Sequence, residues 1–414
     1  MSFKHSNSIT QTKSNERSLP KDWQWVRLGD ICQTTSGGTP LRGTSGYYGG
    51  NIPWVKSGEL NDGFVNSTEE TITELGLQNS SAKLFPAGTL LIALYGATVG
   101  RLGILNMDAA TNQAVCAIFT SDEIDKNYLF HYLLSKREEL VDISFGGAQP
   151  NISQEIIRSI DIPLPPLDEQ RRIASRLNEQ LAAVESARKA AEEQLHTAWQ
   201  LPSAYLQELF GDSAKHKWNW QELGEVCELL PSKTIKSIGD TVVTAITTAC
   251  LSENGFLPAG LKTSRMDAND AKQALVKEGE ILIARSNTPD LVGRVSIYPG
   301  YPPNVVASDL TIRVWAGSAC HPPFLTAYLS YLYLRGFWKE MAGGASGSMK
   351  KITRTQVVEV KIPVPDIETQ KKTVAELQSK MDNFRQLTES LESQLAEINR
   401  LPASLLREAF AGQG

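Results

Sequence analysis

The segment Ile162-Pro163-Leu164-Pro165-Pro166-Leu167-Asp168-Glu169-Gln170 recurs 200 positions later as Ile362-Pro363-Val364-Pro365-Asp366-Ile367-Glu368-Thr369-Gln370. Prolines hold the backbone extended and cannot donate a hydrogen bond, so each segment closes one structural element before another begins. The polar residues that follow are typical of a helix start, with Asp168 as N-cap in the first copy and Asp366 or Thr369 in the second. From these prolines to Phe210 and Phe410 the copies align without a gap. The chain therefore contains an internal duplication in which each half ends in a helix of the same length.

The beginnings of the two halves also match, at an offset of 195 positions. Asp22-Trp23-Gln24-Trp25 corresponds to Lys217-Trp218-Asn219-Trp220, and the Leu-Gly pair at Leu28 corresponds to the pair at Leu223. Between these anchors the globular parts align poorly, which is typical of domains whose loops carry specificity. The period is too long for a solenoid. We predict the following organisation: 1–20 a disordered tail, 21–160 a first globular domain, 161–211 a first spacer helix, 212–360 a second globular domain and 361–414 a second spacer helix.

The two long helices carry apolar residues at alternating spacings of three and four. In the second copy these positions are Val374, Leu377, Met381, Phe384, Leu391, Leu395 and Ile398, and the first copy has smaller residues at the equivalent places. Both copies are polar at one layer, Arg188 and Thr388. The pattern predicts a coiled-coil seam between the two helices, and packing of each helix on its own domain is the alternative. The closing segments Leu201–Phe210 and Leu401–Phe410 could either dock another subunit or cap a core.

The globular parts read as short apolar strands followed by a helix. In the first half the clearest strands are 89–93 and 114–119, followed by a helix over 126–141. The second half repeats the order with 280–284, 310–314 and a helix over 324–341. The sequence therefore predicts the α+β class, with a β-rich core in each domain.

The composition excludes several classes of protein. The five cysteines are scattered without a C-x-x-C pair, which argues against a disulfide framework or a zinc site and favours a reduced, cytoplasmic compartment. The polar first 20 residues lack the apolar stretch of a secretory signal, and no apolar run is long enough to span a bilayer. The net charge of −5 argues weakly against nucleic acid, although residues 212–360 carry 16 basic and 14 acidic side chains. Any DNA contact must therefore come from a local patch.

The motifs that resemble catalytic sites are incomplete. His321-Pro322-Pro323-Phe324 resembles the loop of amino-methyltransferases, but no glycine-rich cofactor loop accompanies it, and two prolines before a helix explain it. The glycines before Lys350 lack the P-loop spacing, and the histidines lack metal-ligand spacing. We therefore expect neither catalysis nor a bound cofactor or metal.

Glycine-rich loops bearing hydroxyl, amide and cationic side chains recur at strand ends in both halves. Asn and Gln can pair with adenine and Arg with guanine, while Gly, Ser and Thr let the backbone approach phosphates. A single loop of this kind also fits an ordinary turn, so the recurrence in both halves carries the argument. The candidate DNA-binding residues are Thr39, Arg42, Lys56, Arg101, Asn112, Gln113, Gln149, Asn151, Lys233, Lys236, Arg285, Asn287, Arg294, Lys350 and Lys351.

Four of these features together resemble a known family. They are Ser36-Gly37-Gly38-Thr39-Pro40, the stretch 47–55, Ala97–Gly100 with Asn112-Gln113, and the proline segment through Gln170. This set is similar to the DNA-specificity subunit of type I restriction-modification systems, and Thr369 departs from the Glu-Gln pair usual there.

The resemblance implies two target-recognition domains, each reading one half of a split site in double-stranded DNA, separated by a pair of long antiparallel helices. It also implies two DNA methyltransferase subunits and a translocating nuclease subunit as partners, which would hold S-adenosylmethionine and ATP. The chain itself would then be non-catalytic. A coiled-coil protein-binding scaffold and a methyltransferase remain the alternatives.

Overall fold

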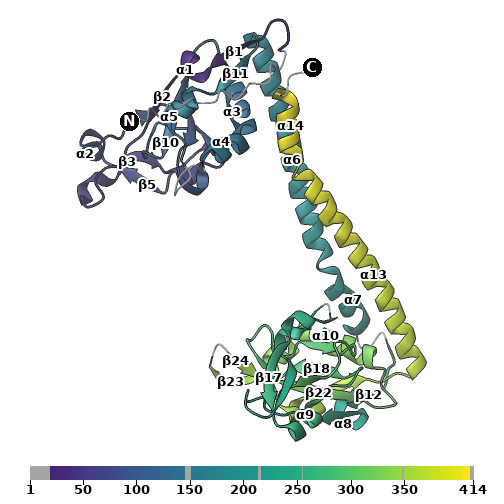
Figure 1. Ribbon diagram of the computed structural model, residues 1–414. Coiled ribbons are helices and arrows are strands. Elements are labelled where there is room, and N and C mark those ends of the chain that lie inside the picture. The colour runs from purple at the N-terminus through teal and green to yellow at the C-terminus, as the bar shows by residue number, and fades with distance from the viewer. Residues whose placement is uncertain (1–18, 145–150, 213–215, 254, 347–348, 411–414) are drawn as a thin grey trace, which may run out of the picture. The chain divides into compact units, whose positions relative to one another are not determined.

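The structure is a computed structural model that describes residues 19–144, 151–212, 216–253, 255–346 and 349–410 (Figure 1). The tail predicted over 1–20 therefore lies almost entirely outside the described residues, as does Gln149. The chain forms two compact units: Met1–Ala191 with Gln394–Gly414, and Glu192–Ser393. It leaves the first unit within helix α6 (Leu167–Ala198) and returns to it within helix α13 (Ile367–Ile398). Both helices have 32 residues, so their predicted equal length is confirmed.

The domain of the first unit, domain 1, is built on two main sheets, and a two-stranded sheet joins β1 (Gln24–Arg27) to β11 (Asp161–Leu164). Its central strand β7 (Leu90–Ala93) is buried along its whole length, as its apolar run predicts. Helix α3 (Lys126–Ser135) packs on the core through Tyr128, Leu129 and Leu133. The five-stranded sheet has the order β2 (Cys32–Ser36), β10 (Val115–Thr120), β7, β8 (Leu102–Leu105) and β4 (Gly63–Val65). The four-stranded sheet has the order β5 (Glu70–Ile72), β3 (Tyr48–Val55), β9 (Ala109–Thr111) and β6 (Leu84–Phe85).

The domain of the second unit, domain 2, repeats the plan. Its main sheet has the order β13 (Cys227–Leu230), β22 (Thr311–Ala316), β18 (Ile281–Ala284) and β20 (Val295–Ile297). A second sheet has the order β17 (Lys262–Met266), β14 (Thr241–Ile246) and β21 (Val305–Ala307). A third joins β19 (Ser286–Asn287), β24 (Met349–Lys351) and β23 (Gly343–Ser346). The predicted α+β class with two similar domains and two long helices is thus confirmed.

Two local predictions were wrong. The helices expected over 126–141 and 324–341 are each two helices: α3 with α4 (Arg137–Ser144), and α10 (Pro322–Leu334) with α11 (Phe337–Met341). Gly336 explains the second break, because its left-handed φ of 81° ends a helix.

The N-cap was misplaced in the first copy only. Helix α6 already begins at Leu167, which puts Asp168 in the first turn. In the second copy Asp366 does accept a hydrogen bond from the backbone N–H of Thr369, at 2.9 Å.

Each long helix is joined to the preceding domain by a fully buried glutamine. The Nε2 of Gln170 donates to the carbonyls of Glu123 (3.0 Å) and Pro165 (2.8 Å), and its Oε1 accepts from the backbone N–H of Asp125 (2.7 Å). Gln370 makes the same three bonds, to Ala319, Pro365 and His321. Because every polar atom finds a backbone partner, the side chain can be buried without an unsatisfied group.

The closing helices complete the cores of both units. In the second unit, helix α7 (Leu201–Phe210) places the ring of Phe210 5.6 Å from Phe324 and 5.2 Å from Tyr328. In the first unit, helix α14 (Leu401–Phe410) places Phe410 within 5.4 Å of Tyr128 and 5.2 Å of Tyr132. Of the two roles considered for these segments, capping a core is therefore the one observed for both phenylalanines.

The long helix α13 combines the two packing modes considered from its sequence. Its first turns pack on domain 2 through Val374 and Leu377. Further along, within the same unit, buried Phe384 meets the ring of Trp199, which follows the end of α6, at 5.4 Å.

Candidate functional site

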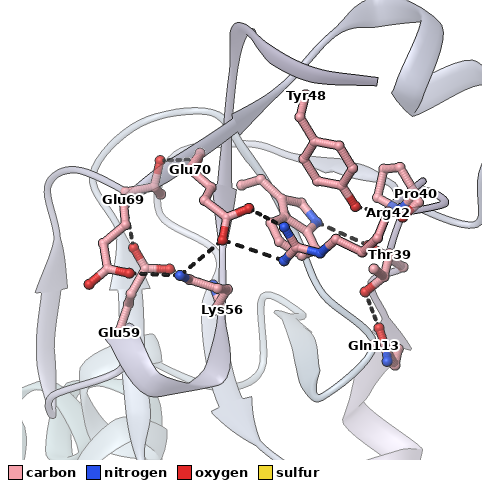
Figure 2. Close-up of polar contacts among 12 residues, drawn as sticks. Thr39, Pro40, Arg42, Tyr48, Lys56, Glu59, Glu69, Glu70 and Gln113 are labelled. Atoms are coloured by element: carbon pink, nitrogen blue, oxygen red, sulfur yellow. Dashed lines mark hydrogen bonds and ion pairs between the residues drawn. The ribbon is translucent and has the colours of Figure 1, made fainter. Parts of the chain in front are cut away.

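Domain 1 brings four of the predicted residues to one exposed corner, between strand β3 and the loop that follows β2 (Figure 2). The loop is fixed at three points. The indole Nε1 of Trp54 donates to the carbonyl of Gly38 at 3.0 Å, and the hydroxyl of Tyr48 donates to the carbonyl of Pro40 at 2.5 Å. The hydroxyl of Thr39 donates to the side chain of Gln113. The remaining two members of this corner are Arg42 and Lys56.

Both cations of this corner are bound to carboxylates. The guanidinium of Arg42 lies 4.7 Å from the ring centre of Tyr48 and 5.0 Å from that of Trp54, and it donates to both carboxylate oxygens of Glu70. The ammonium of Lys56 contacts Glu69 at 2.7 Å and Glu70 at 3.1 Å. Hydrogen bonds from Arg42 first, and then from Lys56, lower the pKa of the Glu70 carboxyl below its ordinary value.

Sequence reasoning missed the acidic half of this cluster. Glu70 lies opposite Trp54 in the β3–β5 register, and the carboxylate of Glu59 accepts from the backbone N–H groups of Lys56 (2.6 Å) and Glu69 (2.8 Å). The β-branched run Thr71-Ile72-Thr73, directly after Glu69 and Glu70, is the one signal that could have indicated a strand there. No local pattern identifies its partner strand.

The other predicted residues of domain 1 are placed differently. The Oδ1 of Asn112 accepts from the backbone N–H of Ala114 at 3.1 Å, which is a turn role, although its amide N–H groups remain available. Arg101 is exposed, and its side chain makes no hydrogen bond or ion pair with the residues that the structure describes. Asn151 is exposed and forms an isolated bridge with Tyr95.

In domain 2 the strand pair β19–β24 gathers four predicted residues. Ser286 lies opposite Lys351 and Asn287 opposite Lys350, and Arg285 immediately precedes β19. Arg285 also has a structural role, because its guanidinium donates to the carbonyl of Asp309 at 3.2 Å. Nearby, burial lowers the pKa of Arg354, and repulsion from Arg285 and Arg313 lowers it further. This end of domain 2 is therefore rich in positive charge.

The remaining predicted residues of domain 2 lie elsewhere. Lys233 pairs with Asp270 at 2.8 Å, and Lys236 is exposed. Arg294 donates to Glu253 at 3.3 Å and lies 5.7 Å from the ring of Tyr333. It lines a groove of about 580 Å³ whose other walls come mainly from β20, α7, α10 and α13, and not from the β19–β24 strands.

A family model described as "Type I restriction modification DNA specificity domain" matches residues 20–194 and again 215–400. The chain belongs to this family. The resemblance inferred from the proline segment is thereby confirmed, and both halves of the duplication carry the type I specificity domain.

Relatives of the chain agree with this assignment. The specificity subunit of the type I restriction enzyme MjaIX from Methanocaldococcus jannaschii is 32% identical over 165 residues, 39% of this chain and 38% of that protein. The match thus spans about two fifths of that relative's length. The MjaVIII specificity subunit of the same organism is 24% identical over 409 residues, 94% of this chain and 92% of that protein.

A chain solved to explain complex assembly and conformational transition of the type I R-M system has the same fold. Its TM-score is 0.71 at 22% identity, over 95% of this chain and 98% of that one.

Among the described residues there is no group of three or more His, Cys, Asp and Glu side chains placed to hold a metal ion. None of the described helices is long and apolar enough to cross a membrane.

Proposed function

We propose that this chain recognises a bipartite site in duplex DNA and directs partner subunits to it. Domain 1 (21–160) reads one half-site and domain 2 (212–360) reads the other, while the helical segments 161–211 and 361–414 connect them. The observation that carries this proposal is the specificity-domain match repeated over both halves.

The two domains combine a shared frame with different polar surfaces, which supports independent reading. The frame repeats its contacts: Tyr132 and Tyr328 donate to the equivalent carbonyls of Asp161 and Lys361. The candidate residues that gather in one place differ between the domains: domain 1 gathers Thr39, Arg42, Lys56 and Gln113, whereas domain 2 gathers Arg285, Asn287, Lys350 and Lys351. A scaffold that read no sequence would have no need for this divergence at the loops.

The partners in this proposal are two copies of a DNA methyltransferase subunit and a translocating nuclease subunit. A duplicated frame offers the same surface twice, which suits two identical subunits. Methyl transfer and cleavage then belong to those partners, which bind S-adenosylmethionine and ATP, and this chain is the non-catalytic reader.

Exchange of one domain tests the proposal. Residues 21–160 are replaced by the corresponding domain of another family member, and the complex with methyltransferase subunits is assayed by mapping methylated sites. We expect one half-site to change and the other to remain. A change in both half-sites, or in neither, contradicts independent reading. Binding to duplex DNA without any sequence preference would favour the scaffold alternative.

A further inference from the structure

The side chain of Arg42 is held in place more firmly than that of an ordinary surface arginine. Surface ion pairs contribute little to stability, largely because two long side chains must be held in one geometry. Here the guanidinium lies over Tyr48 and Trp54, and Trp54 is only 1% exposed. Because the Tyr48 and Trp54 side chains also bond the carbonyls of Pro40 and Gly38, the platform and the loop that carries Arg42 are fixed together. The side chain of Arg42 nevertheless remains 55% exposed.

The guanidinium retains hydrogen-bonding capacity beyond its pair with Glu70. A guanidinium has five N–H donors in a rigid plane, and Glu70 uses one on each terminal nitrogen. The donors left over lie in the same plane. A planar pair of donors matches the O6 and N7 acceptors that guanine presents in the major groove.

The charge of the cluster disfavours a phosphate contact. Two cations, Arg42 and Lys56, are surrounded by three carboxylates, Glu59, Glu69 and Glu70, so the formal charge is 2 − 3 = −1. The carboxylate of Glu69 is 73% exposed and would face an approaching phosphate. A residue that only neutralised the DNA backbone would gain from the absence of these acids.

Domain 2 lacks the counterpart of this cluster at the equivalent positions. Trp54 pairs with Ala110 in the parallel β3–β9 ladder, as Ala245 pairs with Val306 in β14–β21, so Trp54 and Ala245 are equivalent. Across the next strand, Trp54 faces Glu70 and Ala245 faces Lys262. The aromatic platform is thus replaced by alanine, and the carboxylate by a cation. A contact that the fold required would be present in both copies, whereas one that reads a particular base differs between them.

We propose that Arg42 reads a guanine in the half-site of domain 1 and that Glu70 is a positioning residue that holds its guanidinium plane. This assignment rests on the proposed function, because it names the base that one of the two readers recognises.

The test uses the full-length chain, alone and assembled with methyltransferase subunits, and a duplex library with both half-sites randomised. Selected sites are sequenced, and affinities are measured at several salt concentrations. For Arg42→Ala we expect one guanine position of one half-site to lose its preference by about 5- to 150-fold, the equivalent of about 1–3 kcal/mol. The other half-site and the salt dependence stay unchanged. Arg42→Lys does not restore the preference, because lysine lacks the planar fork.

Arg172→Ala is the matched control. Arg172 also forms an exposed pair with both oxygens of a glutamate, Glu169, but on helix α6 and without an aromatic platform, and its replacement leaves the guanine preference intact. A uniform loss of affinity across sequences, with a salt slope lower by about 0.9 and rescue by Arg42→Lys, would make Arg42 a phosphate contact and overturn the inference.

Glu70→Gln tests the positioning role, with Glu169→Gln as its control. The amide keeps the shape and one acceptor but loses the charge, so the preference at the same guanine weakens without vanishing. Glu169 holds Arg172 and not Arg42, and its variant keeps the wild-type preference. An unchanged preference in Glu70→Gln removes Glu70 from the assignment. A selective wild-type chain whose preferences survive Arg42→Ala refutes the inference alone, whereas an unselective wild-type chain refutes the proposed function as well.

Discussion

Domain 2 buries an arginine–glutamate pair, Arg313–Glu280, whose side chains are 3% and 0% exposed, whereas the pair Arg42–Glu70 of domain 1 is at the surface. In the β10–β7 register of domain 1 the places of Arg313 and Glu280 are taken by Ala117 and Thr89. The shared frame therefore accepts either an ion pair or small side chains at one buried place.

The buried pair of domain 2 also ties together segments of that domain. Arg313 donates to the carbonyls of Pro231 (3.0 Å), Gln273 (3.0 Å) and Leu275 (2.5 Å), besides both oxygens of Glu280 at 2.8 Å. A buried charge pair thus organises domain 2, whereas domain 1 is built without a charge pair at the equivalent place. A surface pair does not tie segments of a domain together, so its residues can differ between domains according to the ligand that each domain binds.

Breaking the buried Arg313–Glu280 pair should cause the largest loss of stability. Glu280→Thr leaves Arg313 charged and unpaired inside domain 2, and we expect a loss of about 3–5 kcal/mol in the unfolding free energy of that unit. The double variant Glu280→Thr/Arg313→Ala, which has the residues of domain 1, should lose less than Glu280→Thr alone because no charge is stranded. Calorimetric unfolding of the full chain measures both. A double variant less stable than the single one would mean that the carbonyl contacts of Arg313 outweigh its charge.

The buried glutamine that joins each long helix to its domain should contribute equally to the stability of the two units. Gln170→Ala and Gln370→Ala each remove three hydrogen bonds from a fully buried place, and unsatisfied buried groups cost about 1–3 kcal/mol each. We expect similar losses, each confined to the unfolding transition of its own unit. Unequal losses would show that the joint, although built from the same contacts, is not energetically the same in both halves.

Acid should produce the smallest of the expected differences in stability between the two units. Burial lowers the pKa of His131, whose Nε2 lies 2.8 Å from Oδ1 of Asn178 and whose Nδ1 is buried without a hydrogen-bond partner among the described residues. As the pH falls, the unfolded chain therefore takes up a proton at this histidine before the folded chain does. The stability of the first unit then falls as pH drops below about 6.5, by at most about 1.4 kcal/mol per pH unit. Position 131 corresponds to Ala327 in domain 2, so His131→Ala is the natural exchange.

In His131→Ala the pH dependence of the first unit should flatten, whatever the change in its absolute stability. The second unit keeps the dependence that comes from His321, whose pKa is also lowered, by burial first and then by Lys371. Unfolding curves at pH 5 to 8 provide the measurement. A first unit whose stability still falls with acid after the exchange would assign the effect to another group.

The parts of the structure that the sequence predicted are those with local or repeated signals. The duplication, the equal helices and the buried strands around Leu90–Ala93 and Ile281–Ala284 follow from repeats and apolar runs. The helix break at Gly336 has a local signal, a single glycine, but it was outweighed by the apolar pattern on both sides.

Half of the candidate site could be foreseen and half could not. Cations and amides near strand ends identified Arg42 and Lys350, but their partners depend on strand register. Glu70 meets Arg42 because β5 pairs with β3, and Asn287 meets Lys350 because β19 pairs with β24. Arg294 follows a glycine at a strand end like Arg101 does, yet it turns towards the groove beside α10. Such pairings join residues far apart in the chain, and no spacing within one segment encodes them.

The capping of domain 1 by helix α14 sets an order of events during synthesis. Phe410, which packs on Tyr128 and Tyr132, is made 246 positions after Leu164, the last strand residue of that domain. At about 5–20 residues per second the ribosome needs about 12–50 s for this stretch. Throughout that interval domain 1 has an open aromatic face, whereas domain 2 receives its own cap, Phe210, before its first strand is translated. Loss of helix α14 would therefore damage domain 1, although the two are encoded far apart.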